Sequence, residues 1–183
     1  MMRSLSIALI VATLLCRVPL DAATLAGVTL PDSVNIAGST LLLNGMGVRS
    51  RRLFKVYVAG LYLERKSTDA QAIAAADAPK RLVLHFVRSV SADQVRQAVL
   101  ENFDAASRQA FRAELDALTG ALGPLRDGDE LAFTYIPGTG TRVTVRNSDG
   151  ATIAGLAFAR TLFLVWLGDK PPSTDLRSAL LGR

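Results

Sequence analysis

The sequence predicts an α+β fold in which one strongly curved antiparallel sheet is covered on one face by a layer of helices. The predicted elements come in blocks: strands first, then helices, then an antiparallel meander, then further helices. Such segregation is typical of α+β domains. One strand, residues 53–63, is apolar on both alternating faces, which indicates a central place in the sheet. With 183 residues, 50% of them hydrophobic, the chain can form one domain with a full core.

The first predicted strands are residues 40–43 and 53–63, joined across the Gly45-Met46-Gly47 segment. Apolar side chains occupy both faces of the second strand, with Leu53, Tyr57, Ala59, Leu61 and Leu63 on one and Phe54, Val56, Val58 and Tyr62 on the other. Glycines between two strands are typical of a turn, so we interpret Gly45 and Gly47 as turn residues. A phosphate-binding loop is excluded, because a helix rather than a strand follows such a loop.

The next elements are a short helix and a strand. Residues 69–76 are rich in alanine and predict a helix that ends before Pro79. Residues 81–87 predict a strand in which His85 lies on a half-exposed face.

Two helices follow. Ser91 and Gln94 have the spacing of a capping box, so a helix begins after Ser91. Residues at helical spacing form one stripe on it, namely Val95, Ala98, Val99, Asn102 and Phe103. A second helix is expected to begin at Ser107 and to end at Gly120.

The meander comprises strands 130–136, 142–146 and 151–154, with turns at 137–140 and 147–150. Residues 156–167 then predict a buried helix. Gly168 ends it, and Ser173 or Thr174 caps a short last helix.

Residues 1–22 predict a secretory signal peptide. Arg3 gives a basic start, residues 5–15 form an apolar run, and Ala22 offers a small residue for cleavage. The run is too short for a transmembrane helix, although an uncleaved anchor is the alternative. We therefore divide the chain into a signal peptide, 1–22, and one domain, 23–183, and expect a periplasmic or secreted protein.

The composition excludes several kinds of site. Cys16 is the only cysteine and lies in the predicted signal peptide, so the mature chain has no thiol for a disulfide, for catalysis or for a metal. His85 is the only histidine, and one imidazole makes neither a metal centre nor a Ser-His-Asp triad. We predict no metal and no cofactor.

The charge is modest. The formal net charge of +5 becomes +4 when Arg3, Arg17 and Asp21 leave with residues 1–22, and the basic residues are otherwise scattered apart from the group at 49–52. Nucleic-acid-binding proteins carry a basic stripe with interleaved aromatic residues, which this sequence lacks. The weak positive field suits a small anionic ligand or transient contact with a membrane surface. The sequence leaves the oligomeric state open.

Arg49 is the first candidate site residue. It lies between the glycine segment and the long apolar strand. A guanidinium group there is costly to bury unless it meets an anion or a carbonyl group. The alternative is a solvated arginine at the end of a strand.

Three stretches together resemble the chalcone isomerase-like family over residues 24–182. The first is the pattern Gly45-x-Gly47-x-Arg49 with a strand that ends at residues 60–64, GLYLE. The second is Val87-Arg88 followed by a helix that ends at residues 100–103. The third is the tail 166–173 followed by Asp175-Leu176. The chain is most similar to the exported bacterial branch. The resemblance implies an open-faced β-sandwich with a ligand cleft between the sheet and the helices.

The resemblance also implies roles for two residues. In chalcone isomerases, the arginine at the position of Arg49 is implied to stabilise an enolate-like oxygen. In the related plastid fatty-acid-binding proteins, the arginine at this position is implied to hold a carboxylate. Tyr57 stands where the isomerases have a catalytic threonine and the fatty-acid-binding proteins a tyrosine. Arg49 and Tyr57 together would form a two-point clamp for a carboxylate. The alternative is that Tyr57 packs in the core and its hydroxyl donates a hydrogen bond to a backbone carbonyl group.

Three further positions complete the comparison with the isomerases. Val95 stands where they have a tyrosine, and Val165 where they have a serine or threonine. Asn102 matches the family, although bonding to the backbone near a helix end is its alternative role. The lost hydroxyl groups imply a more apolar cleft with one cation.

We therefore expect an exported, non-catalytic protein that binds a fatty acid or similar amphiphilic anion through Arg49, Tyr57, Asn102, Val95 and Val165. One alternative is an isomerase or intramolecular lyase acting on a chalcone-like or other enone ligand, with Arg49 as electrophile and Asn102 as orienting residue. The other is a structural or interaction protein whose cleft is filled by side chains.

Overall fold

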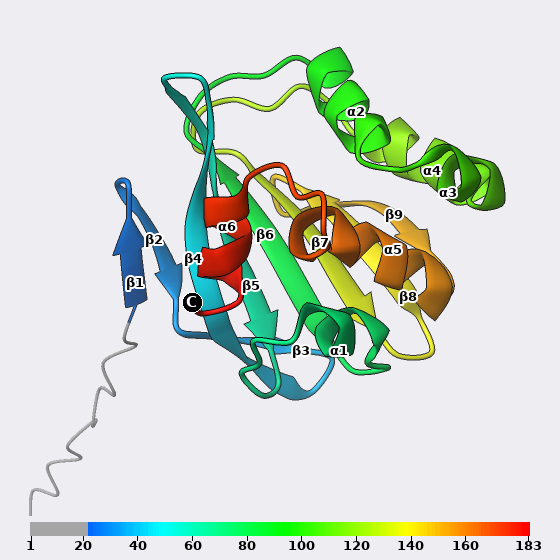
Figure 1. The fold of residues 1–183 in the computed structure, drawn as a ribbon, viewed down its shortest axis with the longest axis horizontal. Helices are drawn as coiled ribbons and strands as arrows, with labels where there is room; N and C mark the ends of the chain where they lie inside the picture. Colours follow the sequence, from blue (N-terminus) through cyan, green and yellow to red (C-terminus); the bar gives the residue numbers. More distant parts are fainter. Residues whose placement is uncertain (1–21) are drawn as a thin grey trace, which may run out of the picture.

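A curled antiparallel sheet of seven strands forms the centre of the computed structural model, which describes residues 22–183 (Figure 1). The strands follow one another in chain order: β3 (Ser33–Ile36), β4 (Ser39–Arg51), β5 (Phe54–Leu63), β6 (Lys80–Phe86), β7 (Glu130–Ile136), β8 (Gly140–Val145) and β9 (Ser148–Ile153). A separate hairpin of β1 (Ala22–Leu25) and β2 (Val28–Pro31) precedes them. Apart from Ala22, the predicted signal peptide lies outside the described residues.

Helices cover one face of this sheet, which confirms the predicted fold class. Three lie on the sheet in Figure 1: α1 (Ala70–Ala75), α5 (Leu156–Leu167) and α6 (Thr174–Leu180). Three more form a group at one side: α2 (Ala92–Glu101), α3 (Ala105–Ala110) and α4 (Arg112–Ala121). Between residues 22 and 183, no helix combines the length and apolarity needed to cross a bilayer.

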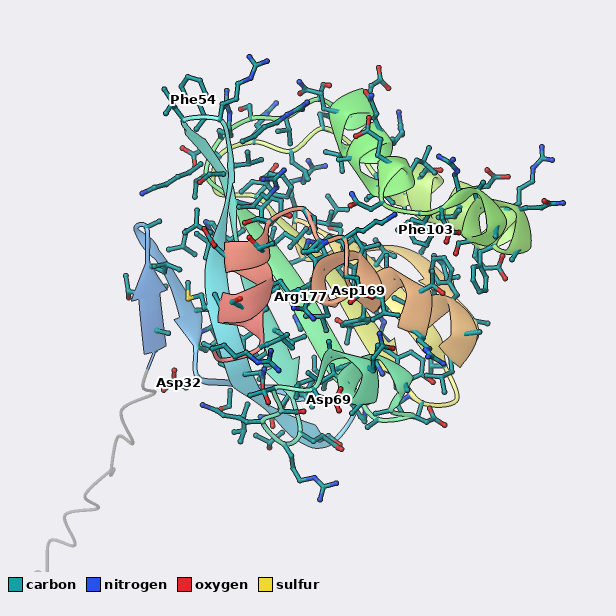
Figure 2. All side chains as sticks on the ribbon, viewed as in Figure 1. Asp32, Phe54, Asp69, Phe103, Asp169 and Arg177 are labelled. Atoms are coloured by element: carbon teal, nitrogen blue, oxygen red, sulfur yellow. The ribbon has the colours of Figure 1, made fainter. Side chains whose placement is uncertain are left out.

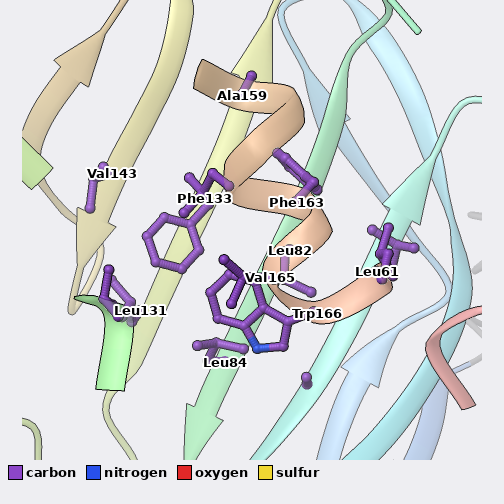
Figure 3. Close-up of a cluster of buried hydrophobic side chains, with 14 of the residues drawn as sticks. Leu61, Leu82, Leu84, Leu131, Phe133, Val143, Ala159, Phe163, Val165 and Trp166 are labelled. Atoms are coloured by element: carbon purple, nitrogen blue, oxygen red, sulfur yellow. The ribbon is translucent and has the colours of Figure 1, made fainter. Parts of the chain in front are cut away.

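The core has two parts, one on each face of the sheet. The larger part lies between the sheet and the helices and includes Leu61, Phe133 and Trp166 (Figure 3). The smaller part includes Leu30 of β2, together with Val58 and Tyr62 of β5. Alternate residues of β5 therefore enter different cores, which confirms that this strand is central and covered on both faces.

Local signals placed most of the helices correctly. The Ser91 and Gln94 capping box is present, Ser173 caps α6, and α5 has the predicted bounds. The helix expected from Ser107 is instead two helices. Asp104 caps the first through the Ser107 amide, and the backbone leaves helical geometry at Phe111, whose ring packs edge-on against Phe158 at 5.7 Å between centroids. The break between the two helices therefore coincides with the packing of Phe111 against Phe158.

The interpretation of Gly45 and Gly47 as turn residues was wrong, because both lie inside β4. A Cβ atom at Gly45 would lie 2.0 Å from the backbone oxygen of Ala179, in α6. These glycines therefore allow a helix to approach the strand. The chain instead turns at Arg52 and Leu53, where Arg52 has φ of 56°. Leu53 is 95% exposed and is not part of the apolar strand.

The turn before β9 is also shorter than predicted. It consists of Arg146 and Asn147, both with positive φ (51° and 61°), as in a type I′ hairpin. Residues 148–150 therefore belong to β9 rather than to the turn.

Candidate functional site

A cleft of about 630 Å³ opens between the sheet and α2, and all five predicted site residues line it. Arg49 comes from β4 and Tyr57 from β5. Val95 lies in α2, Asn102 is the residue that ends α2, and Val165 lies in α5. The fold thus brings together residues that are more than 100 positions apart in the sequence.

Beside polar side chains, four arginines and Glu101 among them, the cleft has apolar walls. Side chains from the sheet and two helices form them, including Leu84, Phe86, Val99, Leu131, Phe133 and Trp166. These residues are buried parts of the larger core, where Figure 3 labels Leu84, Leu131, Phe133 and Trp166, so the cleft extends into this core. Small-molecule sites are typically concave and combine apolar surface with placed polar groups that fix the orientation of the ligand.

Arg49 and Tyr57 are direct cross-strand neighbours in β4 and β5. A register shift follows immediately, between Arg49 and Ser50, and such irregularities re-aim side chains at the edges of sheets. The guanidinium Nη1 donates to the carbonyl of Ser50. A guanidinium has five N–H donors, and Arg49 makes no ion pair with any residue in 22–183. It therefore keeps donors for an anion.

The Tyr57 hydroxyl has an unused proton. Its oxygen accepts a hydrogen bond of 3.0 Å from Nε1 of Trp166. An indole N–H can only donate, so Tyr57 must be the acceptor, and its own O–H finds no acceptor within the described chain. The alternative of a bond to a backbone carbonyl is thus not observed. Phe86 packs against the ring at 5.5 Å between centroids and helps to fix its orientation.

Burial raises the pKa of Tyr57 to about 12, although the hydrogen bond from Trp166 and the charge of Arg49 both act to lower it. The phenol therefore stays neutral throughout the physiological range. A neutral phenol donates a hydrogen bond, so Tyr57 and Arg49 present donors of two kinds, one neutral and one charged, to the same cleft.

The other three predicted residues differ in environment. Val95 and Val165 are buried, and each gives the cleft an apolar surface. Asn102 is exposed at the rim, and its side-chain amide donates to the carbonyl of Ala98 at 2.6 Å. The alternative proposed for Asn102, bonding to the backbone near a helix end, is therefore what the structure shows.

The expectation of a single cation was wrong, because Arg51, Arg52 and Arg88 line the cleft together with Arg49. The sequence grouped three of these arginines but did not pair Arg88 with them. The pairing of β5 with β6 explains why Arg88 lies near the other three arginines. Tyr57 pairs with Phe86, so the chain just beyond Phe86 must run beside the β4–β5 hairpin. The hydrogen bond between Trp166 and Tyr57 was also missed, because no local sequence pattern connects the two residues.

His85 lies elsewhere, on a half-exposed face of β6 as predicted, with Nδ1 3.3 Å from a carboxylate oxygen of Glu130. No group of three or more potential metal-ligating side chains occurs between residues 22 and 183.

The chain is similar to known proteins in both sequence and fold. A family model described as chalcone isomerase-like matches residues 22–182. The fold is similar to the crystal structure of a fatty-acid-binding protein from Arabidopsis thaliana, with a TM-score of 0.72 and 16% sequence identity, over 88% of this chain and 96% of that one. No curated protein matches the sequence.

Proposed function

The chain belongs to the chalcone isomerase-like family, and on that premise we propose that it binds a fatty acid or a similar amphiphilic anion without catalysing a reaction. The observation that carries this proposal is the pairing of Arg49 with the free hydroxyl proton of Tyr57 at an apolar cleft. A carboxylate accepts hydrogen bonds from both groups, and bonds of this charge-assisted kind are the stronger ones.

In this arrangement the hydrocarbon tail lies along the apolar walls between the sheet and α2, near Leu84, Val99 and Phe133. The carboxylate lies at Arg49 and Tyr57. A volume of about 630 Å³ is within the range of roughly 300–1,000 Å³ of small-molecule sites. The similar Arabidopsis protein is described as fatty-acid-binding, which supports the same ligand class here.

The cleft volume supports a ligand over a cleft filled by side chains. Native mass spectrometry of the purified mature protein tests this choice. A bound lipid that co-purifies, or a one-to-one complex formed when a long-chain fatty acid is added, is the expected result. A protein that remains ligand-free in both experiments would favour the structural or interaction role.

The enzymatic alternative uses the same two groups differently. Arg49 and Tyr57 could stabilise the oxygen of an enone ligand, but Val95 and Val165 supply no hydroxyl groups to organise water or to hold a phenol. We therefore expect no chalcone-to-flavanone conversion above the uncatalysed rate. The assay follows the loss of chalcone absorbance with protein in excess. Formation of a stereochemically pure flavanone would establish the isomerase instead.

We also propose that the domain is exported. The support is the apolar run at residues 5–15 between Arg3 and Ala22. Protein recovered from its native compartment is expected to begin near Ala23, which N-terminal sequencing measures. A soluble cytoplasmic protein with an intact Met1 would contradict export.

A further inference from the structure

The hairpin formed by β4 and β5 extends past its neighbours at one end. The pairing of β5 with β6 stops at Tyr57 and Phe86, whereas β4 and β5 continue to pair up to Arg51 and Phe54. Residues 51–55, here called the hairpin tip, therefore lie on a projecting two-stranded ribbon (Figure 1). Figure 2 shows Phe54 at its outer end.

The hairpin tip exposes two large apolar side chains next to each other. Leu53 is 95% exposed and Phe54 is 62% exposed. The other large hydrophobic residues exposed in the described chain, Leu25 and Leu42, are only 36% and 40% exposed and lie apart from the tip. Exposed apolar surface of this kind, concentrated at a protrusion, favours contact with an apolar environment.

Cations surround these two side chains. Arg51, Arg52 and Lys55 are exposed in the tip itself, and the guanidinium of Arg88 lies 5.0 Å from the centre of the Phe54 ring. No aspartate or glutamate occurs in residues 44–63. None of the four cations makes an ion pair among residues 22–183. Apolar side chains beside lysine and arginine are typical of segments that bind anionic membrane surfaces.

We propose that the hairpin tip docks on the surface of a lipid bilayer that contains anionic lipids. Leu53 and Phe54 enter the headgroup region, while Arg51, Arg52 and Lys55 meet lipid phosphates. Phe54, Arg51 and Arg52 also line the cleft, so docking places the cleft opening against the membrane, where an amphiphilic molecule enters or leaves. The docking uses only the tip and does not depend on the proposed ligand.

The test is co-sedimentation of the mature protein, without added fatty acid, with vesicles. One set contains phosphatidylcholine alone and the other equal parts of phosphatidylcholine and phosphatidylglycerol. Binding to the anionic set, reduced by added salt, is expected. The double variant Leu53→Ser/Phe54→Ser is expected to bind at least about tenfold more weakly. The double variant Arg51→Gln/Lys55→Gln is expected to lose about fivefold in affinity for the anionic vesicles for each charge removed.

Two matched double variants serve as controls. Leu25→Ser/Leu42→Ser removes the other exposed apolar residues, and Arg108→Gln/Arg112→Gln removes two exposed arginines from the α3–α4 region. Both are expected to bind within about twofold of the wild type. Thermal melting followed by circular dichroism verifies that every variant is folded.

Three outcomes would overturn the proposal: no binding of the wild type to anionic vesicles, equal binding to both vesicle sets, or unchanged binding of the tip variants. The last would mean that another surface of the protein makes the membrane contact. None of these outcomes bears on fatty-acid binding, which is measured separately.

Discussion

Arg49→Ala is expected to weaken the binding of a long-chain fatty acid by roughly 1.5–3 kcal/mol, which is about tenfold to more than a hundredfold in the dissociation constant. The physical reason is the loss of a charge-assisted hydrogen bond at a partly buried position. Arg51 ends β4, Arg52 lies in the turn after it, and the guanidinium of Arg88 lies over the Phe54 ring, so we do not expect these arginines to restore the contact beside Tyr57. Calorimetric titration of delipidated protein measures the change.

Two conservative variants separate the parts of the clamp. Arg49→Lys is expected to recover only part of the affinity, because an ammonium group cannot reproduce the two-pronged fork of a guanidinium. Tyr57→Phe is expected to reduce the affinity by about 1 kcal/mol, since it removes one neutral donor. It also leaves Nε1 of Trp166 without its acceptor, so its thermal stability must be measured alongside binding.

A fatty alcohol of equal chain length is the matched control ligand. It is expected to bind the wild type more weakly than the acid and to respond little to Arg49→Ala, because it carries no charge for the guanidinium to meet. Equal losses for the acid and the alcohol would show that Arg49 shapes the cleft rather than recognising a carboxylate.

The elements that the sequence predicted well depend on neighbouring residues. The capping box of Ser91 and Gln94 and the bounds of α5 and β7 all follow from patterns within one helix or strand. Arg49 was also found locally, as a cation beside an apolar strand, whereas the family resemblance singled out Tyr57. What the sequence could not supply was their register, which pairs them directly across two strands.

The features that were missed depend on contacts between distant segments. Trp166 lies 109 positions from Tyr57, and no local pattern connects an indole to a phenol at that separation. Gly45 and Gly47 are a similar case, because a glycine needed for a turn and a glycine needed for close packing look identical in one sequence.

The contact between β4 and α6 explains why position 45 requires a glycine. The neighbouring Asn44 is buried, and its amide donates to the carbonyls of Leu180 at 2.7 Å and Ser67 at 3.0 Å, while it accepts from the Ser67 amide at 2.7 Å. These bonds hold the end of α6 directly against the strand. The helix therefore cannot withdraw from Gly45 without breaking a buried hydrogen bond.

Gly45→Ala is accordingly expected to lower the free energy of unfolding by about 3 kcal/mol or more, and the melting temperature by about 6–12 °C. The added Cβ would lie 2.0 Å from the Ala179 oxygen and 2.8 Å from that of Leu180, and backbone atoms cannot rotate away as a side chain can. Denaturant unfolding followed by circular dichroism measures the change. Gly120→Ala in α4 is the control: its new methyl group would meet no heavy atom within 4 Å, so it is expected to be neutral or to stabilise by up to about 1 kcal/mol. If both variants behaved alike, close packing of α6 on β4 would not be the reason for glycine at position 45.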